Sequence, residues 1–261
     1  MTDVRPGYLP NGLFSCLHAP ETPHATTAVL LVQPLFGEYV QHHRCFYVIA
    51  EALAARGIPA LRYDHLGTGD SPGDLADASP ARWVEDVVSA ARALTASTGA
   101  SRIHLVGARM GAVLALAAAP QVPRTSSLVL WEPIRSPAMH LDGLVQTHRK
   151  VLGNVLSAPN DALPAADGTW DVLGFQIPGR LWSDLAALRP EPRQLAEDLE
   201  VAVLGEPPTL ADWSPPDGYD RWSMRPVDHP HGWLDPADGI YDVLVPSTVV
   251  ENVSQWAGDR S

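Results

Sequence analysis

The chain has 261 residues, of which 46% are hydrophobic, enough to bury one sizeable core and too many for a disordered chain. Its formal net charge of −12 argues against nucleic acid as a partner, because binding to phosphates needs clustered cations. Two cysteines do not make a disulfide framework, and no apolar run is long enough to cross a bilayer, so we expect a soluble, cytoplasmic protein with no membrane association. Of the 18 lysines and arginines, all but Lys150 are arginines, a bias typical of GC-rich genomes such as those of actinobacteria.

Short β-rich runs alternate with helical patterns through the first half of the chain, which predicts βαβ units and a parallel sheet. Ser79 and Pro80 have the residue types of an N-cap and a first helical position, and Gly57 and Gly99 stand where helices commonly end. In chain order we expect a strand at 27–32, a helix at 40–56, a strand at 58–63, a helix at 80–98, a strand at 102–106, an alanine-rich helix ending at Pro120 and a strand at 127–131.

The periodicity weakens between residue 134 and about residue 190, where prolines interrupt short helical patches. This segment predicts a cap inserted into the domain rather than a second domain, because it is too poor in apolar periodicity to fold alone. Beyond it we expect strands at 201–204 and 222–227 and a closing helix at 243–256. The sequence therefore predicts a single α/β domain over residues 1–261, with a mostly parallel central sheet flanked by helices and a small cap.

The segment Gly107–Gly111 (Gly-Ala-Arg-Met-Gly) joins a predicted strand to a predicted helix. Strand, Gly-x-x-x-Gly and helix is the context of a nucleophile elbow, a sharp turn whose central residue takes a strained, positive φ. The central residue here is Arg109 rather than a serine. A plain strand-to-helix connection with two glycines is the alternative interpretation of this segment.

Two further turns favour the elbow. Residues 33–38 (Gln-Pro-Leu-Phe-Gly-Glu) follow the first predicted strand, and residues 64–71 have the spacing Asp-x-x-Gly-x-Gly-x-Ser after the next. The order of these segments and of the elbow resembles the α/β-hydrolase family from about residue 25 to residue 133. The resemblance implies an α/β-hydrolase fold in which Arg109 replaces the nucleophile.

Within that family the chain is similar to the exosortase-system-associated hydrolases. Those proteins also have Gly-x-Arg-x-Gly-Ala at the elbow, as residues 107–112 do here. Residues 130–133 (Leu-Trp-Glu-Pro) resemble their Trp-x-Pro segment, and residues 173–175 (Leu-Gly-Phe) resemble a recurrent cap motif. Nothing in the sequence indicates an exosortase pathway.

Arginine stays protonated at any working pH, so Arg109 can be neither a nucleophile nor a general base, and an acyl-enzyme at this position is excluded. Two hypotheses for its role stay open. The guanidinium can project into a pocket and hold a carboxylate, a phosphate or a polarised carbonyl. Alternatively it is an inert replacement that pairs with a buried acid such as Glu132.

The resemblance places the family's histidine after the last strand, where His229 and His231 stand; either can be the base, with His231 preferred, or both are surface histidines. It implies backbone oxyanion donors at Leu35 or Phe36 and at Met110. The acid is open among three residues: Glu206, Asp212 and Glu132. Of these, Glu132 directly follows a predicted strand, at the edge where such sheets bind ligands.

Tryptophans gather in the second half of the chain, among them Trp131, Trp182 and Trp233. They are either core residues or the wall of a pocket for an aromatic or bulky apolar ligand.

Three functions remain open. The first is acyl transfer from an activated substrate, such as a thioester on a small molecule, a peptide or an acyl carrier protein, directly to an external acceptor in a secondary-metabolite pathway. The second is an epimerase or lyase that stabilises an enolate in the former oxyanion hole. The third is a pseudohydrolase that only binds a ligand or partner. No metal or other cofactor is expected, and a homodimer is left open.

Overall fold

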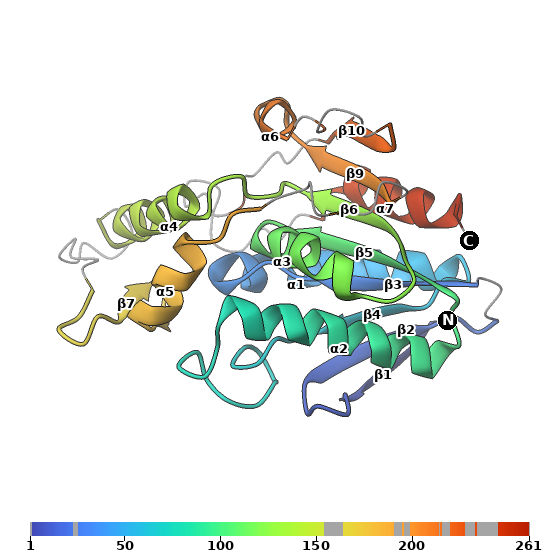
Figure 1. The fold of residues 1–261 in the computed structure, drawn as a ribbon, viewed down its shortest axis with the longest axis horizontal. Helices are drawn as coiled ribbons and strands as arrows, with labels where there is room; N and C mark the ends of the chain where they lie inside the picture. The colour runs from blue at the N-terminus through green and yellow to red at the C-terminus, as the bar shows by residue number, and fades with distance from the viewer. Residues whose placement is uncertain are drawn as a thin grey trace.

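The computed structural model describes residues 2–22, 26–153, 164–190, 195, 199–213, 215, 220–227, 233 and 245–260 (Figure 1). Its strands are β1 (Asp3–Tyr8), β2 (Phe14–Ala19), β3 (Thr27–Val32), β4 (Ala60–Tyr63), β5 (Arg102–Ala108), β6 (Thr125–Trp131), β7 (Trp170–Val172), β8 (Phe175–Ile177), β9 (Glu200–Gly205) and β10 (Trp222–Pro226). Its helices are α1 (Phe36–Ala55), α2 (Pro80–Thr98), α3 (Met110–Ala118), α4 (Pro137–Val151), α5 (Gly179–Ala186), α6 (Pro207–Asp212) and α7 (Ser247–Gly258), with a 3₁₀ turn at Ala119–Gln121.

The main sheet has the strand order β1-β2-β4-β3-β5-β6-β9-β10. Strands β4, β3, β5, β6, β9 and β10 are parallel to one another, whereas β1 and β2 form an antiparallel hairpin at one edge, and β2 pairs antiparallel with β4. The predicted α/β architecture with a mostly parallel sheet is confirmed. All six residues of β3 are buried, as expected for a strand covered on both faces.

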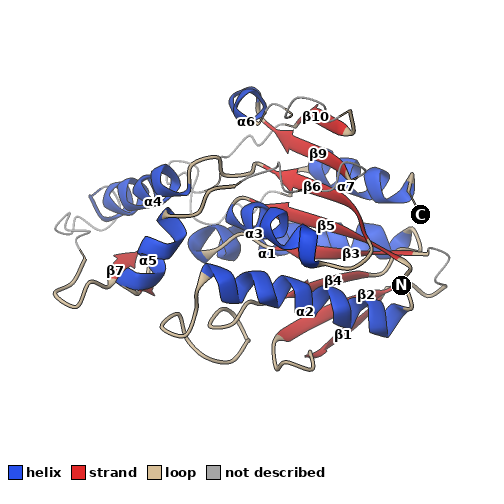
Figure 2. Ribbon diagram, viewed as in Figure 1, coloured by secondary structure: helices blue, strands red, loops and turns tan. Residues whose placement is uncertain are grey.

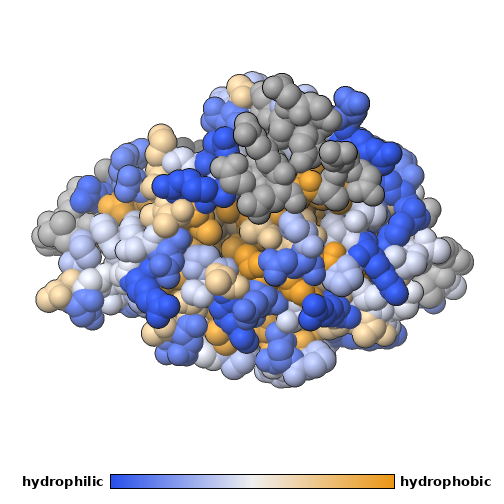
Figure 3. Space-filling view, viewed as in Figure 1, coloured by the Kyte–Doolittle hydropathy of each residue, from blue (hydrophilic) through white to orange (hydrophobic). Residues whose placement is uncertain are grey.

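Helices cover both faces of this sheet (Figure 2). Side chains of α2 and α3 form one apolar core with the sheet, and side chains of α1 and α7 form a second core on the opposite face. On the face shown in Figure 3, apolar residues show through in the middle, between hydrophilic side chains that cover most of the rest. The parallel strands thus end between two helical layers, which leaves their carboxyl edge as the place for a site.

Local signals account for several of these elements. Ser79 accepts a hydrogen bond from the Arg82 amide at 3.2 Å and caps α2, and Gly99 ends that helix with a φ of 71°. Helix α1 begins at Phe36, four residues before the expected start at residue 40. The hairpin β1–β2 is not among the predicted strands, because the side chains of β1 are mostly exposed and lack apolar alternation.

The segment predicted as a cap contains α4, β7, β8 and α5. Figure 1 shows α4, β7 and α5 beyond the carboxyl ends of the parallel strands. Inside this segment Trp182 of α5 stacks on Trp170 of β7, with ring centroids 4.5 Å apart. None of the helices in the described part of the chain combines the length and the apolarity needed to span a bilayer.

Candidate active site

Arg109 lies at a nucleophile-elbow turn between β5 and α3. Its φ of 53° and ψ of −124° give it the positive φ predicted for this position. The two glycines are required by close approach: a Cβ on Gly111 would stand 2.2 Å from the Gln33 carbonyl oxygen, and one on Gly107 would stand 2.7 Å from the Ala112 Cα. The backbone therefore has the form of the elbow although no nucleophile occupies it.

The side chain of Arg109 is held by contacts from three elements. Its Nε donates to Glu38 Oε1 at 2.9 Å, and one terminal nitrogen donates a longer bond of 3.4 Å to the backbone carbonyl of Glu132. The other terminal nitrogen donates to Nδ1 of His140 at 3.4 Å. Because a guanidinium carries five N–H groups, two remain without an acceptor among the described residues. The side chain as a whole is 20% exposed.

Glu38 is the carboxylate partner of the arginine. It lies in the first turn of α1 and is only 2% exposed. Burial alone raises the pKa of a carboxyl group, but the Arg109 guanidinium and the nearby His140 more than offset this, so the pKa of Glu38 is below its usual value. The site therefore contains a buried ion pair at neutral pH.

His140 on α4 connects the predicted cap segment to this ion pair. Since Nδ1 accepts from Arg109, the proton of the neutral ring is on Nε2, which lies 3.5 Å from Glu38 Oε2. Burial is the main reason that the pKa of His140 is lowered to about 4, and the positive charge of Arg109 lowers it further. His140 is therefore neutral at pH 7, as its acceptor role requires.

His42 and two tryptophans form the aromatic side of the site. The His42 ring stacks on Trp233 at 4.1 Å between centroids, and the guanidinium carbon of Arg109 lies 5.1 Å from the centroid of the Trp233 ring. Trp131 packs against Trp233 at 4.7 Å and is almost fully buried. Burial lowers the pKa of His42 to about 4, so this ring is also neutral at pH 7.

The carboxylate of Glu132 does not pair with Arg109. Its Oε1 accepts from the backbone amide of Glu206, the N-cap residue of α6, and its Oε2 accepts from the Thr209 hydroxyl. The carboxylate thus caps the N-terminus of α6, where negative charge is favourable. The interpretation of Glu132 as the acid that pairs with Arg109 is corrected: Glu38 has that place, and Glu132 contributes a backbone carbonyl.

The other predicted site residues lie as follows. Leu35 is the N-cap of α1, Phe36 begins that helix with a positive φ of 54°, and Met110 begins α3. All three are buried. Because Gly111 packs closely against the Gln33 carbonyl, the start of α3 lies next to the start of α1. Their oxyanion role stays a prediction.

Of the predicted tryptophans, Trp131 and Trp233 lie at the arginine, whereas Trp182 packs on Trp170 within the cap segment. Glu206 and Asp212 are exposed residues of α6 and its cap. His229 and His231 lie outside the described residues.

Glu38 and His140 are not among the site residues that the sequence predicts. Glu38 had a usable signal, because it is an acidic residue in the segment already assigned to the oxyanion loop. His140 had none, because its place depends on how the predicted cap segment folds back over the sheet.

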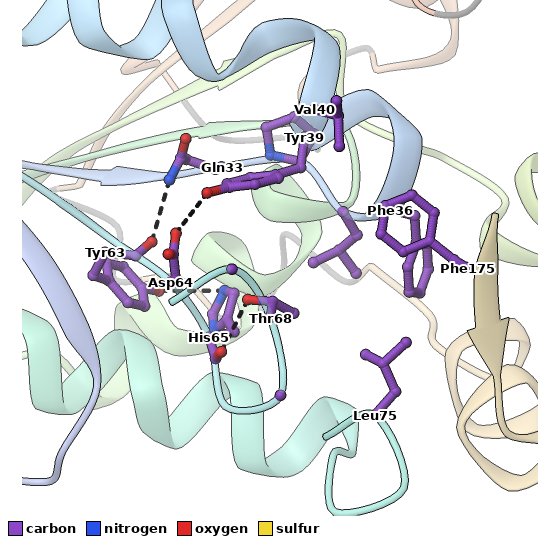
Figure 4. Close-up of a pocket in the computed structure, with 14 residues that line it drawn as sticks. Gln33, Phe36, Tyr39, Val40, Tyr63, Asp64, His65, Thr68, Leu75 and Phe175 are labelled. Carbon is purple, nitrogen blue, oxygen red and sulfur yellow. Dashed lines mark hydrogen bonds between the residues drawn. The ribbon is translucent and has the colours of Figure 1, made fainter. Parts of the chain in front are cut away.

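Beside residues 33–36 lies a cavity of about 240 Å³ (Figure 4). At one end the rings of Phe36 and Phe175 pack together, with centroids 5.8 Å apart, and Phe175 comes from β8 of the predicted cap. Leu75 adds apolar surface, while on another side Tyr39 donates a hydrogen bond of 2.9 Å to Asp64. The cavity is thus largely apolar, and Phe36 joins it to the loop predicted to supply an oxyanion donor.

The chain is similar to known proteins both in sequence and in structure. The family described as "Serine aminopeptidase, S33" matches residues 22–174, and no curated protein matches the chain. Similar solved structures include the esterase domain of a Rhodothermus marinus protein, with 17% identity, a TM-score of 0.60 and 99% of both chains covered.

Two more structures are similar over nearly the whole chain. Est1E from Butyrivibrio proteoclasticus, solved with ferulic acid, has 16% identity and a TM-score of 0.62, with 95% of this chain and 96% of that one covered. A soluble variant of monoglyceride lipase from Saccharomyces cerevisiae has 14% identity and a TM-score of 0.61, with 100% and 95% covered. At these identities the structures show a shared fold alone. Because the family match spans more than half of the chain, the chain belongs to the serine aminopeptidase S33 family of α/β-hydrolase-fold proteins.

Proposed function

We propose that this protein transfers an acyl group from an activated ester or thioester directly to an external acceptor, without forming an acyl-enzyme. The observation that carries the proposal is the retained elbow with an anchored arginine at its centre. A strained backbone conformation of this kind has a free-energy penalty of about 1–3 kcal/mol, and its retention without a nucleophile is consistent with a site that is still used.

The unused donors of Arg109 support a role at a developing negative charge. The guanidinium is oriented by Glu38 and His140, and two of its N–H groups have no acceptor among the described residues. Donors that are already oriented stabilise an oxyanion by roughly 3 kcal/mol each, because no reorganisation is needed when the charge forms. Arg109 would therefore bind the acyl oxygen or an anionic group of the substrate.

The cavity beside Phe36 supports an apolar acyl group. Its wall is made mostly by apolar side chains, including the paired rings of Phe36 and Phe175. An aromatic or short aliphatic acyl group placed there would have its carbonyl next to the loop formed by residues 33–36. The acceptor attacks that carbonyl carbon, the carbon–sulfur or carbon–oxygen bond of the donor breaks, and the proton lost by the acceptor goes to the released thiolate or alkoxide.

Binding without catalysis is the second candidate, and a specific observation favours it. The charge of Arg109 is already neutralised by Glu38, and His42 and His140 are neutral rings engaged in other contacts. Among the described residues near Arg109, these two histidines are the candidates for a general base. Each has a pKa of about 4, which makes it a weak base.

The deciding experiment is mass spectrometry of the purified protein incubated with benzoyl and short-chain acyl thioesters of N-acetylcysteamine, each with thiol, amine or alcohol acceptors. Direct transfer predicts acylated acceptor, no acyl mass on the protein, and a rate that falls by about 100-fold or more in Arg109→Gln. The matched control Arg92→Gln, at an exposed position of α2, should keep the rate of the unchanged protein.

Three other outcomes separate the alternatives. An acyl mass on the protein would contradict direct transfer. Tight binding of the thioesters with no transfer would identify a pseudohydrolase. Solvent deuterium incorporated next to the thioester carbonyl, again with no transfer, would identify an epimerase.

Arg109→Ser tests whether only the nucleophile is missing. We expect no efficient hydrolysis of p-nitrophenyl esters, because the variant leaves the Glu38 carboxylate buried without its counter-ion beside the new hydroxyl. A large gain in ester hydrolysis would show instead that the rest of a hydrolase site is intact.

A further inference from the structure

A second cleft, of about 560 Å³, lies at the amino ends of β5, β6 and β9. It is lined by the first residues of these strands, which are Arg102, Thr125 and Glu200. Arg109 follows the carboxyl end of β5, so this cleft is at the opposite edge of the sheet from the candidate active site. In Figure 1 that edge lies on the side of the chain's C-terminus.

The cleft is positively charged although the chain is strongly acidic. Its charged residues, without the histidine, have a net charge of +2, in a chain whose formal net charge is −12. They are Arg102, Arg124, Arg221, Arg260, Glu200 and Asp259. An anion is the ligand that this local excess of cations attracts.

Two of the arginines have most of their donors available. Arg102 donates one hydrogen bond, to the Thr26 hydroxyl at 3.2 Å, and Arg124 donates one, to the Ala100 carbonyl at 3.2 Å. Each guanidinium has five N–H groups, so both can also bind a multidentate anion. Arg260 differs, because it pairs with Glu200 and stacks over the Trp256 ring.

The cleft also contains a fully buried histidine with an orphan nitrogen. His104 lines the cleft, and its Nδ1 lies 2.7 Å from the Ser127 hydroxyl, which accepts a hydrogen bond from Trp256 Nε1 at 2.9 Å. Ser127 has no other acceptor among the described residues, so its hydroxyl donates to His104 Nδ1. The proton of the neutral ring is therefore on Nε2, which is buried and has no hydrogen-bond partner among the described residues. Such a donor is unfavourable unless a ligand accepts its hydrogen bond.

The backbone next to His104 and Arg124 departs from regular strand geometry. Arg124 has a positive φ of 66°, and the pairing of β5 with β6 shifts register between Ile103 and His104. The shift places the hydroxyls of both Ser126 and Ser127 against the His104 ring, at 3.2 Å and 2.7 Å from Nδ1. Bulges commonly re-aim side chains beside functional sites.

We propose that this cleft binds a phosphate group, held by the Nε2–H of His104 and the guanidinium groups of Arg102 and Arg124. Phosphate fits better than carboxylate, because it offers three oxygens to donors that come from three side chains. The cleft is larger than one phosphate group, which leaves room for the organic part of a phosphate ester. The proposal does not depend on acyl transfer, since the two sites are at opposite edges of the sheet.

The test is isothermal titration calorimetry on the full chain at about 20 mM ionic strength, with inorganic phosphate, glycerol 3-phosphate and citrate as probes. Both phosphate compounds should bind, and the double variant Arg102→Gln/Arg124→Gln should weaken binding by about tenfold or more. These side chains are exposed, so the variant should remain folded, and Arg92→Gln is the matched control. In the unchanged protein, the Nε2–H resonance of His104 should shift on addition of phosphate.

Equal affinities for the two phosphate compounds would assign the site to the phosphate group alone, and tighter binding of the ester would assign it to a phosphorylated small molecule. Three results would overturn the proposal. They are no binding of either compound at roughly 10 mM, the same affinity in the double variant, or binding of citrate without phosphate.

Discussion

Arg109 places a permanent positive charge at a position that is four-fifths covered by protein. A charge in that environment needs a partner, and Glu38, itself 2% exposed, supplies it at 2.9 Å. The two residues are therefore interdependent: removal of either leaves the other as an uncompensated charge. The same pair determines the direction of the guanidinium, and with it any role that Arg109 has toward a substrate.

We expect Glu38→Gln to lower the free energy of unfolding by about 2 kcal/mol, less than for a fully buried pair because Arg109 is partly exposed. Urea denaturation measures this change. The double variant Glu38→Gln/Arg109→Met should be less destabilised than the sum of the single variants, with a coupling energy of about 1–3 kcal/mol.

Glu85→Gln is the control for that experiment, because Glu85 is 67% exposed and pairs with Arg82 at 3.5 Å. Its effect should stay within about 0.5 kcal/mol. If the changes in unfolding free energy of the two single variants simply added up in the double variant, the Glu38–Arg109 coupling energy would be zero and the ion pair would not contribute to stability.

At the scale of elements, the site depends on how closely α3 approaches the end of β3. Gly111 is at this contact, where a Cβ would stand 2.2 Å from the backbone oxygen of Gln33 and 2.5 Å from that of Val32. Because both neighbours are backbone atoms, they cannot move aside without shifting the strand or the helix. The approach also brings the starts of α1 and α3, the two predicted sources of oxyanion donors, next to each other.

Gly111→Ala should destabilise the protein by more than about 2 kcal/mol, because one methyl group forces the two elements apart. Gly143→Ala is its matched counterpart: Gly143 is inside α4 and has no atom within 4 Å of the added Cβ. That substitution should stabilise the protein by about 0.5–1 kcal/mol through helix propensity. Thermal denaturation followed by circular dichroism compares the two, and equal effects would show that the contact at Gly111 can relax.

At the scale of the whole molecule, three histidines in the described part of the chain have strongly lowered pKa values. The pKa values of His42, His104 and His140 are each lowered to about 4, in every case chiefly by burial. In the unfolded chain the same groups titrate near 6.5. Between these values the unfolded state binds more protons than the folded state, so acid favours unfolding.

We therefore expect stability to be nearly constant above pH 7 and to fall as the pH decreases from about 6.5 toward 4. Three groups together give a slope of up to about 4 kcal/mol per pH unit in that window. Urea midpoints measured from pH 8 to pH 5 test this. His140→Gln should reduce the slope of stability against pH by the contribution of one histidine. A flat profile down to pH 5 would show that these rings can be protonated without unfolding.

Much of the fold followed from local sequence patterns. The buried strands are short apolar runs. Ser79 is a residue type that is strongly preferred at helix N-caps, and Gly107 and Gly111 mark a turn that tolerates no larger residue. Strand β1 carries no such pattern, because an edge strand with exposed side chains needs no apolar alternation.

By itself the sequence determined the α/β architecture, the elbow, and the absence of a nucleophile at residue 109. Only the tertiary structure decided what Arg109 does with its charge. Its partners Glu38 and His140 are 71 and 31 positions away along the chain, on α1 and α4. Turns and caps depend on neighbouring residues, whereas an ion pair depends on which side chains the strand crossovers bring together. The same reason applies to His104 and Ser127, whose pairing across two strands depends on the β5–β6 register.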